Sequence, residues 1–313
     1  MNTRYGWVGF FYFLETMNIL NNENFNNKIN DLAIKYGYQL YDIAFIDKDE
    51  KCYHYQHIKA NRSNNAYSAT KMFIMTAVGL LFDEGKLTPN DKVLDHLRTF
   101  VKCEYDKTWE KVTIAHCLGH KMGIERGYLD IDAEDIESDD HTTLAFSVPL
   151  PYEPGTTRTY SDAAYYILAR VATEVCGEPL DNYLSRKLYR PLKFKEVAMT
   201  KCPMGYVVGG TGLYCPTTDM AKLAMVYMNR GVFEGKRILS EEWIKFVEAN
   251  EYGLECREEI TYGRTGAHGQ FICYSPVTKK AFAIHAYQTD GNYTFREVII
   301  GELLTSDYTL KED

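Results

Sequence analysis

The sequence has no surplus of positive charge and no run of basic residues. It contains 35 Lys and Arg against 43 Asp and Glu, which gives a net charge of −8 at pH 7 over 313 residues. Proteins that bind nucleic acid use Lys and Arg to displace counterions from phosphates. This charge balance therefore argues against a nucleic-acid partner.

Paired cysteines and long apolar runs are also missing. None of the eight cysteines forms a Cys-x-x-Cys pair, and their wide spacing predicts reduced, mostly buried thiols. The apolar segment Trp7–Leu14 is too short to span a bilayer, and Glu15 follows it without a small-x-small cleavage site. We expect a cytoplasmic protein without a membrane anchor, with secretion as the open alternative. Residues 1–16 would either dock on the fold or precede a start at Met17.

Internal repeats and low-complexity linkers are likewise lacking. Hydrophobic residues make up 45% of the chain and charged residues 25%, which is typical of a globular protein with a substantial core. We expect a single domain over residues 1–313. Its sheet lobe would comprise about 18–65 and 206–313, and its helical lobe about 66–205.

Strand-like patterns lie near both ends of the chain, and helical spacing dominates the middle. We therefore expect an α+β fold, in which an antiparallel sheet is built from both ends. Helices would flank this sheet, and a mainly helical lobe would be inserted. Thr217 or Thr218 is expected to cap one helix and Ser240 another. The expected strands are 40–47, 52–58, 269–275 and 280–288, and the expected helices are 25–36, 69–84, 111–119, 161–176, 180–188, 217–229, 240–249 and 295–304.

Ser68-Ala-Thr-Lys71 begins an apolar helical stretch and is the central chemical motif. At a spacing of three, the two side chains share one helix face. A serine hydroxyl becomes a good nucleophile when a base removes its proton, and a lysine can serve as that base. A Ser-x-x-Lys match is expected about once by chance in a chain of this length. Taken alone, it is equally consistent with a helix cap and a solvated lysine.

Further segments of the sequence support a catalytic role for this motif. The stretch 66–97 resembles the nucleophile helix of the serine β-lactamase and penicillin-binding-protein superfamily, and is closest to its class C β-lactamase-like branch. This branch includes esterases, D-amino peptidases and aminohexanoate-oligomer hydrolases. The resemblance continues in order through residues 113–124, 154–162, 210–223, 235–240 and 269–276.

The resemblance implies a β-lactamase-like fold and a role for each of three residues. Ser68 would attack a carbonyl and form an acyl-enzyme, with Lys71 as its paired base. Tyr160 would work with Lys71 to relay the proton to the leaving group. The function implied is hydrolysis of a small ester or amide, or of a peptide-like substrate, without a cofactor.

The resemblance also implies a strand that borders the substrate. We assign its first triplet to His268, Gly269 and Gln270, which makes the backbone N–H of Phe271 the expected oxyanion donor with that of Ser68. A shift of one residue, or a purely structural role for His268, stays open. In this assignment the Lys-Thr-Gly triplet of β-lactamases is absent, so binding of a β-lactam carboxylate would be weakened.

Asp162 stands where the family has an amide in its Tyr-x-Asn element. An ionised carboxylate only accepts hydrogen bonds, so Asp162 would bind a substrate amine or hydroxyl, or orient Lys71. This departure also argues against an efficient β-lactamase. Two alternatives stay open, namely a catalytically silent binding or sensor protein and an acyltransferase. The sequence leaves the oligomeric state unknown.

Three other patterns compete weakly for function. His116 and His120 have a spacing that can bind zinc, but no Glu follows as in His-Glu-x-x-His, and we expect no metal site. The glycine-rich run 209–212 lacks the Lys-Ser/Thr of a phosphate-binding loop. The acidic stretch 130–140 is expected to be a solvated loop, unless it lines the cleft and favours cationic substrates.

Overall fold

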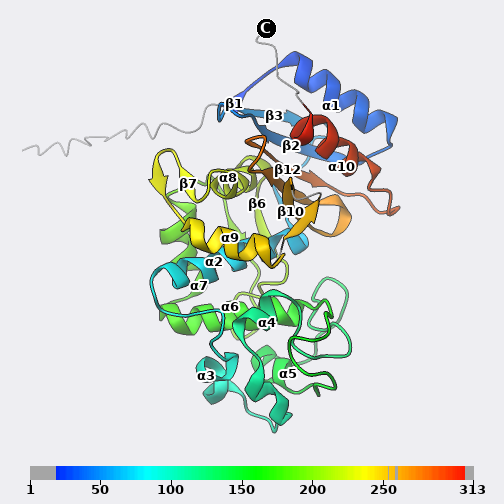
Figure 1. Cartoon of the computed structure of the whole chain (residues 1–313). Helices are drawn as coiled ribbons and strands as arrows, with labels where there is room; N and C mark the ends of the chain where they lie inside the picture. The colour runs from blue at the N-terminus through cyan, green and yellow to red at the C-terminus, as the bar shows by residue number, and fades with distance from the viewer. Residues whose placement is uncertain (1–18, 253, 258–259, 307–313) are drawn as a thin grey trace, which may run out of the picture.

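The computed structural model describes residues 19–252, 254–257 and 260–306 (Figure 1). The expectations for Trp7–Leu14 and Met17 lie outside the described residues. Within these ranges, no helix combines the length and the apolar character that crossing a membrane requires.

A seven-stranded sheet forms one end of the molecule. Its central pair joins β2, from the start of the chain, to β12, from its end, in antiparallel register with Ala44 opposite Ala283. This pairing confirms the expected sheet built from both chain ends, and the short β1–β3 edge pair is parallel. In sheet order the strands are β1 (Ile19–Leu20), β3 (Cys52–Gln56), β2 (Leu40–Ile46), β12 (Lys280–Ala286), β11 (Phe271–Ser275), β10 (Thr261–Thr265) and β9 (Glu255–Arg257).

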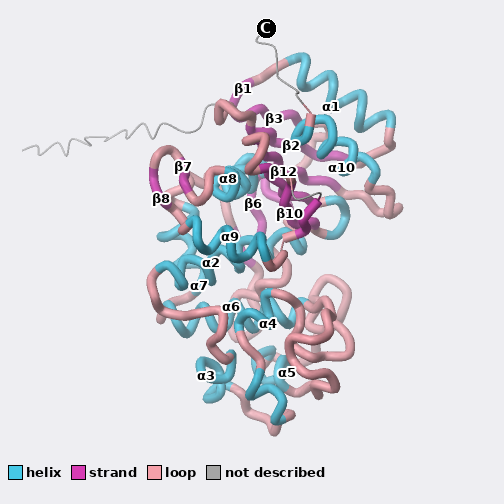
Figure 2. Tube along the Cα trace, in the orientation of Figure 1, coloured by secondary structure: helices cyan, strands magenta, loops and turns pink. Residues whose placement is uncertain are grey.

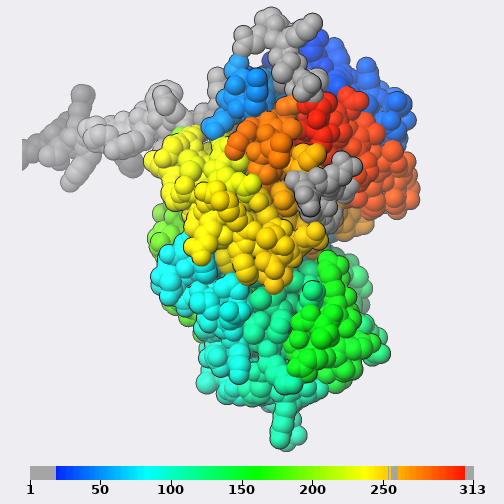
Figure 3. Space-filling view, viewed as in Figure 1, coloured from blue at the N-terminus to red at the C-terminus, as the bar shows by residue number. Residues whose placement is uncertain are grey.

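Helices cover both faces of this sheet because its central strands are apolar on both sides. On one face, α1 (Glu23–Lys35) and α10 (Thr294–Ile299) pack on side chains that include Phe45 and Phe282. On the other face, α8 (Thr217–Met228) covers the alternate positions of β2 and β12. In Figure 3 the blue N-terminal and red C-terminal residues accordingly lie together at one end of the molecule.

The middle of the chain folds into helices and long loops at the other end (Figure 2). Helix α2 is apolar around its whole circumference, so it lies buried between α6 and α9. The division into lobes at residues 65 and 206 stays a prediction. The helices here are α2 (Thr70–Asp83), α3 (Val93–Leu97), α4 (Ile114–Leu118), α5 (His141–Phe146), α6 (Asp162–Cys176), α7 (Leu180–Leu184) and, nearer the sheet, α9 (Glu241–Ala249).

The two predicted helix caps have different outcomes. Ser240 Oγ accepts the Trp243 N–H at 3.0 Å, which confirms it as the cap of α9. The prediction of Thr217 or Thr218 as a cap is wrong, because α8 begins directly after Pro216 and has no side-chain cap.

A second, three-stranded sheet leads the chain into the nucleophile turn. In it β6 (Leu213–Pro216) lies between β4 (Ser63–Asn65) and β5 (Ala198–Met199). The Ala66 N–H donates to the Leu213 carbonyl at 2.8 Å just beyond the end of β4. This small sheet therefore fixes the backbone immediately before Ser68.

Candidate active site

Ser68 lies in a single 3₁₀ turn, Tyr67–Ala69, that precedes α2. Tyr67 has a φ of 45°, an uncommon backbone conformation for a residue with a side chain. Asn65 Oδ1 accepts the N–H groups of Tyr67 at 2.9 Å and Gly212 at 3.2 Å. These bonds hold Ser68 at the junction of the small sheet and the buried helix.

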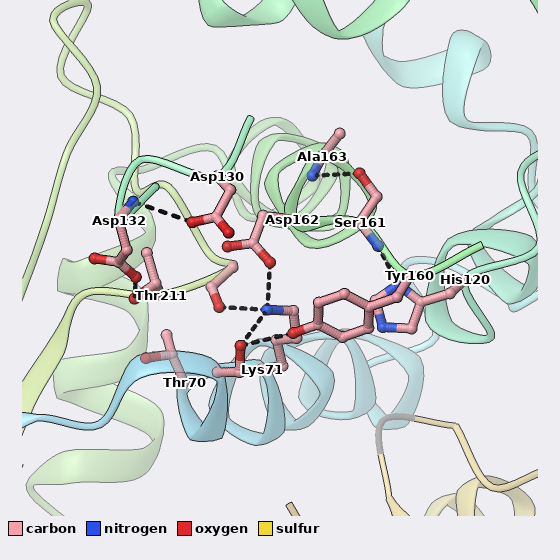
Figure 4. A network of polar contacts seen from close by, with 12 residues as sticks. Thr70, Lys71, His120, Asp130, Asp132, Tyr160, Ser161, Asp162, Ala163 and Thr211 are labelled. Atoms are coloured by element: carbon pink, nitrogen blue, oxygen red, sulfur yellow. Dashed lines mark hydrogen bonds and ion pairs between the residues drawn. The ribbon is translucent and has the colours of Figure 1, made fainter. Parts of the chain in front are cut away.

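Lys71 lies one turn further along and is fully buried. Its Nζ donates to Ser68 Oγ at 3.0 Å, to Asp162 Oδ1 at 2.6 Å and to the Gly210 carbonyl at 2.6 Å (Figure 4). All three N–H donors of the ammonium are therefore used. One of them points at the serine, as the Ser-x-x-Lys spacing predicts.

Tyr160 approaches the same serine from the loop before α6. The Tyr160 Oη lies 2.6 Å from Ser68 Oγ, although the two residues are 92 positions apart in the chain. The Lys71 Nζ lies 4.9 Å from the centre of the Tyr160 ring, and 42% of Tyr160 is exposed. The structure thus brings together the serine, lysine and tyrosine that the sequence motifs singled out.

Asp162 is the first residue of α6 and only 6% exposed. Its carboxylate pairs with Lys71, which is one of the two roles that the sequence left open for it. A Cβ on Gly210 would lie 2.7 Å from Asp162 Cγ, so a side chain there would collide with the carboxylate. The glycine at position 210 therefore allows the backbone carbonyl and the carboxylate to approach the same ammonium.

The strand that borders Ser68 is β10. A pocket of about 280 Å³ opens beside Ser68 and Tyr160, and the consecutive residues 264–267 line it. A Cβ on Gly266 would lie 2.5 Å from the Ala66 carbonyl oxygen and 3.3 Å from the Ala69 nitrogen. The end of β10 is therefore packed directly against the nucleophile turn.

Residues 268–271, the expected substrate strand, form the turn after β10 and the start of β11. His268 stacks on Tyr287, with ring centres 4.7 Å apart, and its ring centre also lies 5.0 Å from that of Tyr67, the residue before Ser68. Gly269 packs against the Tyr38 hydroxyl, and its carbonyl accepts that hydroxyl at 2.9 Å. None of these residues lines the Ser68 pocket within the described part of the chain.

Gln270 and Phe271 follow the turn that separates β10 from β11. The Gln270 side chain is buried and contacts His285 Nδ1 and the Ala286 carbonyl. Phe271 packs in the core against Phe282. The chain reverses direction at residues 266–270, so His268, Gly269 and Gln270 lie in this turn and Phe271 begins the next strand of the sheet.

The residues in the expected place are Arg264, Thr265 and Gly266. This triplet differs from Lys-Thr-Gly by one cationic residue, and that likeness is the sequence signal that would have identified the strand. Arg264 is 3% exposed, and its guanidinium lies 5.4 Å from the Tyr160 ring centre. A cationic residue therefore does occupy the first position of the triplet beside the nucleophile.

His120 packs against Tyr160. The His120 Nδ1 accepts the Ser161 N–H at 3.3 Å, and its ring lies 4.6 Å from the Tyr160 ring and 5.2 Å from the Tyr165 ring. Since Nδ1 accepts, Nε2 carries the proton of the neutral ring. His120 thus acts as a packed spacer between the two tyrosines.

Burial lowers the pKa of His120 to about 2, and the positive charges of Arg264, Lys71 and Arg158 contribute. The folded protein therefore resists protonation of His120, whereas the unfolded chain accepts a proton near pH 6.5. His120 therefore does not reduce the unfolding free energy above about pH 6.5. Below this pH, the unfolding free energy falls as the pH drops towards 2. The unfolding free energy of the natural protein should therefore fall between pH 7.5 and pH 5. We expect this fall to be about 2 kcal/mol smaller in His120→Gln.

Urea unfolding followed at both pH values measures this difference. His57→Gln provides the control, because His57 lies on the strand side of the molecule outside the site. An equal loss of stability in the His120 variant and the natural protein would contradict the assignment of His120 as a buried neutral ring.

His116 and the acidic stretch supply no hydrogen bond to Ser68, Lys71 or Tyr160 among the described residues. His116 Nδ1 accepts the Thr113 N–H at 3.2 Å within the cap of α4, and no group of three possible metal ligands occurs among the described residues. From the acidic stretch, Asp132 accepts the Thr211 hydroxyl at 2.5 Å, and burial raises the pKa of Asp132. Asp130 and Asp132 lie on the Asp162 side of Lys71, away from Tyr160 (Figure 4).

The sheet, the helical region and the arrangement of Ser68, Lys71 and Tyr160 agree with the class of serine hydrolases. The Beta-lactamase family model matches residues 51–299, and the chain belongs to the β-lactamase family. A relative from Escherichia coli O157:H7, named as a D-alanyl-D-alanine carboxypeptidase, is 26% identical over 290 residues. The match covers 69% of this chain and 67% of that relative.

Two solved structures share the fold. The octameric penicillin-binding protein homologue from Pyrococcus abyssi has a TM-score of 0.69 at 19% identity, over 89% of this chain and 76% of that one. EstCE1, described as a hydrolase with promiscuous acyltransferase activity, has a TM-score of 0.68 at 16% identity, over 88% of this chain and 95% of that one. These comparisons confirm the β-lactamase-like α+β fold.

Proposed function

We propose that the protein cleaves a small ester or amide through an acyl-enzyme on Ser68. The observation that supports the proposal is that Lys71 and Tyr160 both lie within hydrogen-bond distance of the Ser68 hydroxyl. Ser68 Oγ lies 3.0 Å from Lys71 Nζ and 2.6 Å from Tyr160 Oη. Such distances are within the reach that proton transfer requires.

Lys71 would act as the base in its neutral form. The ammonium donates to Ser68 Oγ, so its nitrogen has no free lone pair while all three donors are used. After loss of one proton, the lone pair can point at Ser68 Oγ, and the two remaining N–H groups still satisfy Asp162 and the Gly210 carbonyl. The Asp162 carboxylate and this carbonyl therefore hold the amine in place in both forms.

The proton balance then follows from the geometry. Ser68 Oγ bonds to the substrate carbonyl carbon, and its proton passes to Lys71. Tyr160 gives its proton to the leaving group as the bond to that group breaks, and recovers one from Lys71. Water then attacks the acyl-enzyme by the reverse route, which releases the acid and restores Ser68.

The backbone N–H groups of Ser68 and Ala267 would bind the oxyanion. Within the described ranges, neither N–H has an acceptor in the protein, whereas the Gly266 N–H next to Ala267 donates to the Gln270 carbonyl at 2.8 Å. The close packing of Gly266 on the nucleophile turn brings the two free donors to the same pocket. The proposed donor therefore moves from Phe271 to Ala267.

The substrate class is narrowed by the size of the pocket and by the relatives. A volume of about 280 Å³ suits a small substrate group. A relative is named as a D-alanyl-D-alanine carboxypeptidase, so peptide-like amides are the first substrates to test. The residues proposed for catalysis supply the base, the acid and the oxyanion donors without a cofactor.

The test is intact-mass analysis after treatment with a fluorophosphonate. We expect one adduct per chain in the natural protein and none in Ser68→Ala, because the reagent bonds to an activated serine oxygen. Ser240→Ala is the matched control, since Ser240 is a helix cap outside the site, and it should keep the single adduct.

Absence of an adduct in the natural protein would instead favour the binding or sensor function. Hydrolysis and acyl transfer are separated next, by adding an alcohol or amine acceptor to an ester assay. A transfer product that exceeds the free acid would identify an acyltransferase. The promiscuous acyltransferase activity described for the similar EstCE1 makes this assay worthwhile.

A further inference from the structure

The pocket beside Ser68 collects arginines from three separate parts of the chain. Arg158 lies in the loop before Tyr160, Arg264 lies at the end of β10, and Arg296 lies on α10. The chain as a whole carries a net charge of −8, so this positive cluster is opposite in sign to the overall charge. Among the described residues, no carboxylate lines the pocket with them.

These arginines have no carboxylate partner in the described part of the chain, although two of them are buried. Arg264 is 3% exposed, and among the described residues its one acceptor is the Ser68 carbonyl at 3.4 Å. Arg296 is 9% exposed, and its Nε has no hydrogen-bond partner among the described residues. A buried charge without a partner is unfavourable, and guanidinium groups do not lose their proton to escape it. Unpaired guanidinium groups around a pocket indicate that an anion completes the site.

Aromatic rings position one of these charges. The Arg296 guanidinium lies 4.0 Å from the centre of the Tyr293 ring, and Tyr293 also lines the pocket. It lies 5.7 Å from the Phe271 ring centre on the core side. Such contacts stabilise the cation without neutralising it, so its N–H groups are available to a ligand.

The three arginines line the same pocket as Tyr160. Tyr160 is the proposed proton donor to that group, Arg264 lies over its ring, and Arg158 precedes it by two residues. We propose that the leaving group of the substrate carries two anionic groups, which Arg158, Arg264 and Arg296 bind. This inference rests on the proposed function, because it uses Tyr160 to define the leaving-group side.

Two anionic groups fit the three cations better than one. A single carboxylate pairs with one guanidinium fork and would leave two positive charges without a partner. An acidic amino acid released from an amide has two carboxylates, and a phosphorylated hydroxy-amino acid has a carboxylate and a phosphate. Both share the required chemistry, and a comparison of matched ligands distinguishes them.

The test measures binding to the Ser68→Ala protein by isothermal titration calorimetry. Four ligands share an N-acetylalanyl group, in both enantiomers, and end in glutamate, O-phosphoserine, glutamine or glutamine amide. We expect the glutamate ligand to bind at least tenfold more tightly than the glutamine amide, with glutamine between them. Tighter binding of the phosphoserine ligand than of the glutamate ligand would identify phosphate as the second group.

Arginine variants in the Ser68→Ala background locate the effect. Arg158→Gln should lower the preference for the dianionic ligand roughly tenfold, because a charge-assisted hydrogen bond is lost. Arg296→Gln should do the same, and Arg296→Lys should keep part of the preference while preserving the packing on Tyr293. Arg190→Gln is the matched control, since Arg190 is exposed outside the pocket, and it should leave the preference unchanged.

Equal affinity for the glutamate ligand and the glutamine amide would overturn the proposal. An unchanged preference in Arg158→Gln and Arg296→Gln would overturn it as well. Fluorophosphonate labelling of Ser68 is measured separately on the natural protein. Labelling without an anion preference would therefore reject only this inference, whereas no labelling would reject the proposed function on which it rests.

Discussion

Replacement of Lys71 by Met is expected to lower kcat/KM for an ester substrate by about 10³-fold, because general-base catalysis contributes on this scale. The variant has no group that can take the Ser68 proton, and it removes the hydrogen bond that Lys71 donates to Ser68 Oγ at 3.0 Å. It also leaves the Asp162 carboxylate buried without its cation, which we expect to lower the unfolding free energy by about 3 kcal/mol. Steady-state kinetics and urea unfolding measure the two effects separately.

A second buried Lys–Asp pair provides a matched control. Lys222 is 4% exposed and pairs with Asp219 at 2.6 Å within α8, outside the Ser68 pocket. Lys222→Met should lose a similar unfolding free energy but keep most of its activity in the folded fraction. Lys71→Met with activity close to that of Lys222→Met would remove Lys71 from the mechanism.

Replacement of Gly266 by Ala is expected to lower kcat about 10²-fold, which is typical of the loss of one oxyanion donor. The added Cβ would lie 2.5 Å from the Ala66 carbonyl oxygen, so the end of β10 must move away from the nucleophile turn. The Ala267 N–H moves with it and no longer meets the developing negative charge. KM should change less than kcat, because this interaction is strongest in the transition state.

Gly79 and Gly301 serve as controls for this substitution. A Cβ on Gly79 would lie 2.3 Å from the Trp243 ring, about 16 Å along α2 from Ser68 at the rise of an α-helix. Gly79→Ala should therefore lower stability but keep kcat in the folded protein. Gly301→Ala should keep kcat and should not lower stability, because nothing lies within 4 Å of its Cβ position and alanine favours a helix. Normal kcat in Gly266→Ala would exclude Ala267 as an oxyanion donor.

Local patterns predicted much of the architecture. The hairpin of β2 and β3 follows from two apolar strands around a polar turn, in which Asp47 Oδ1 accepts the N–H groups of Asp49 and Lys51. Helix α2 follows from an apolar run that starts at Ser68. Such signals depend on residues that are neighbours in the chain, so they are visible without a structure.

The register at the end of β10 was not predictable in the same way. Two glycine-containing triplets, starting at Arg264 and at His268, stand four residues apart, and either could begin the strand beside the nucleophile. The turn at residues 266–270 contains the second triplet, so the first triplet ends the strand beside the nucleophile. Strand pairing depends on contacts between distant residues, so the alternation of apolar and polar residues does not select a triplet, and only the likeness of the first to Lys-Thr-Gly favours it.

By itself, the sequence determined which residue types take part in the chemistry. It also determined that Ser68 and Lys71 lie on one helix face, because residues three positions apart share a face. Tyr160, Asp162 and the Gly210 carbonyl reach that face only through the packing of α6 and the glycine-rich run against α2. The cluster of Arg158, Arg264 and Arg296 also depends on tertiary structure, since α10 and β10 meet the Tyr160 loop only in the folded protein. Local spacing thus sets the nucleophile and its base, whereas long-range packing decides which charges surround the substrate.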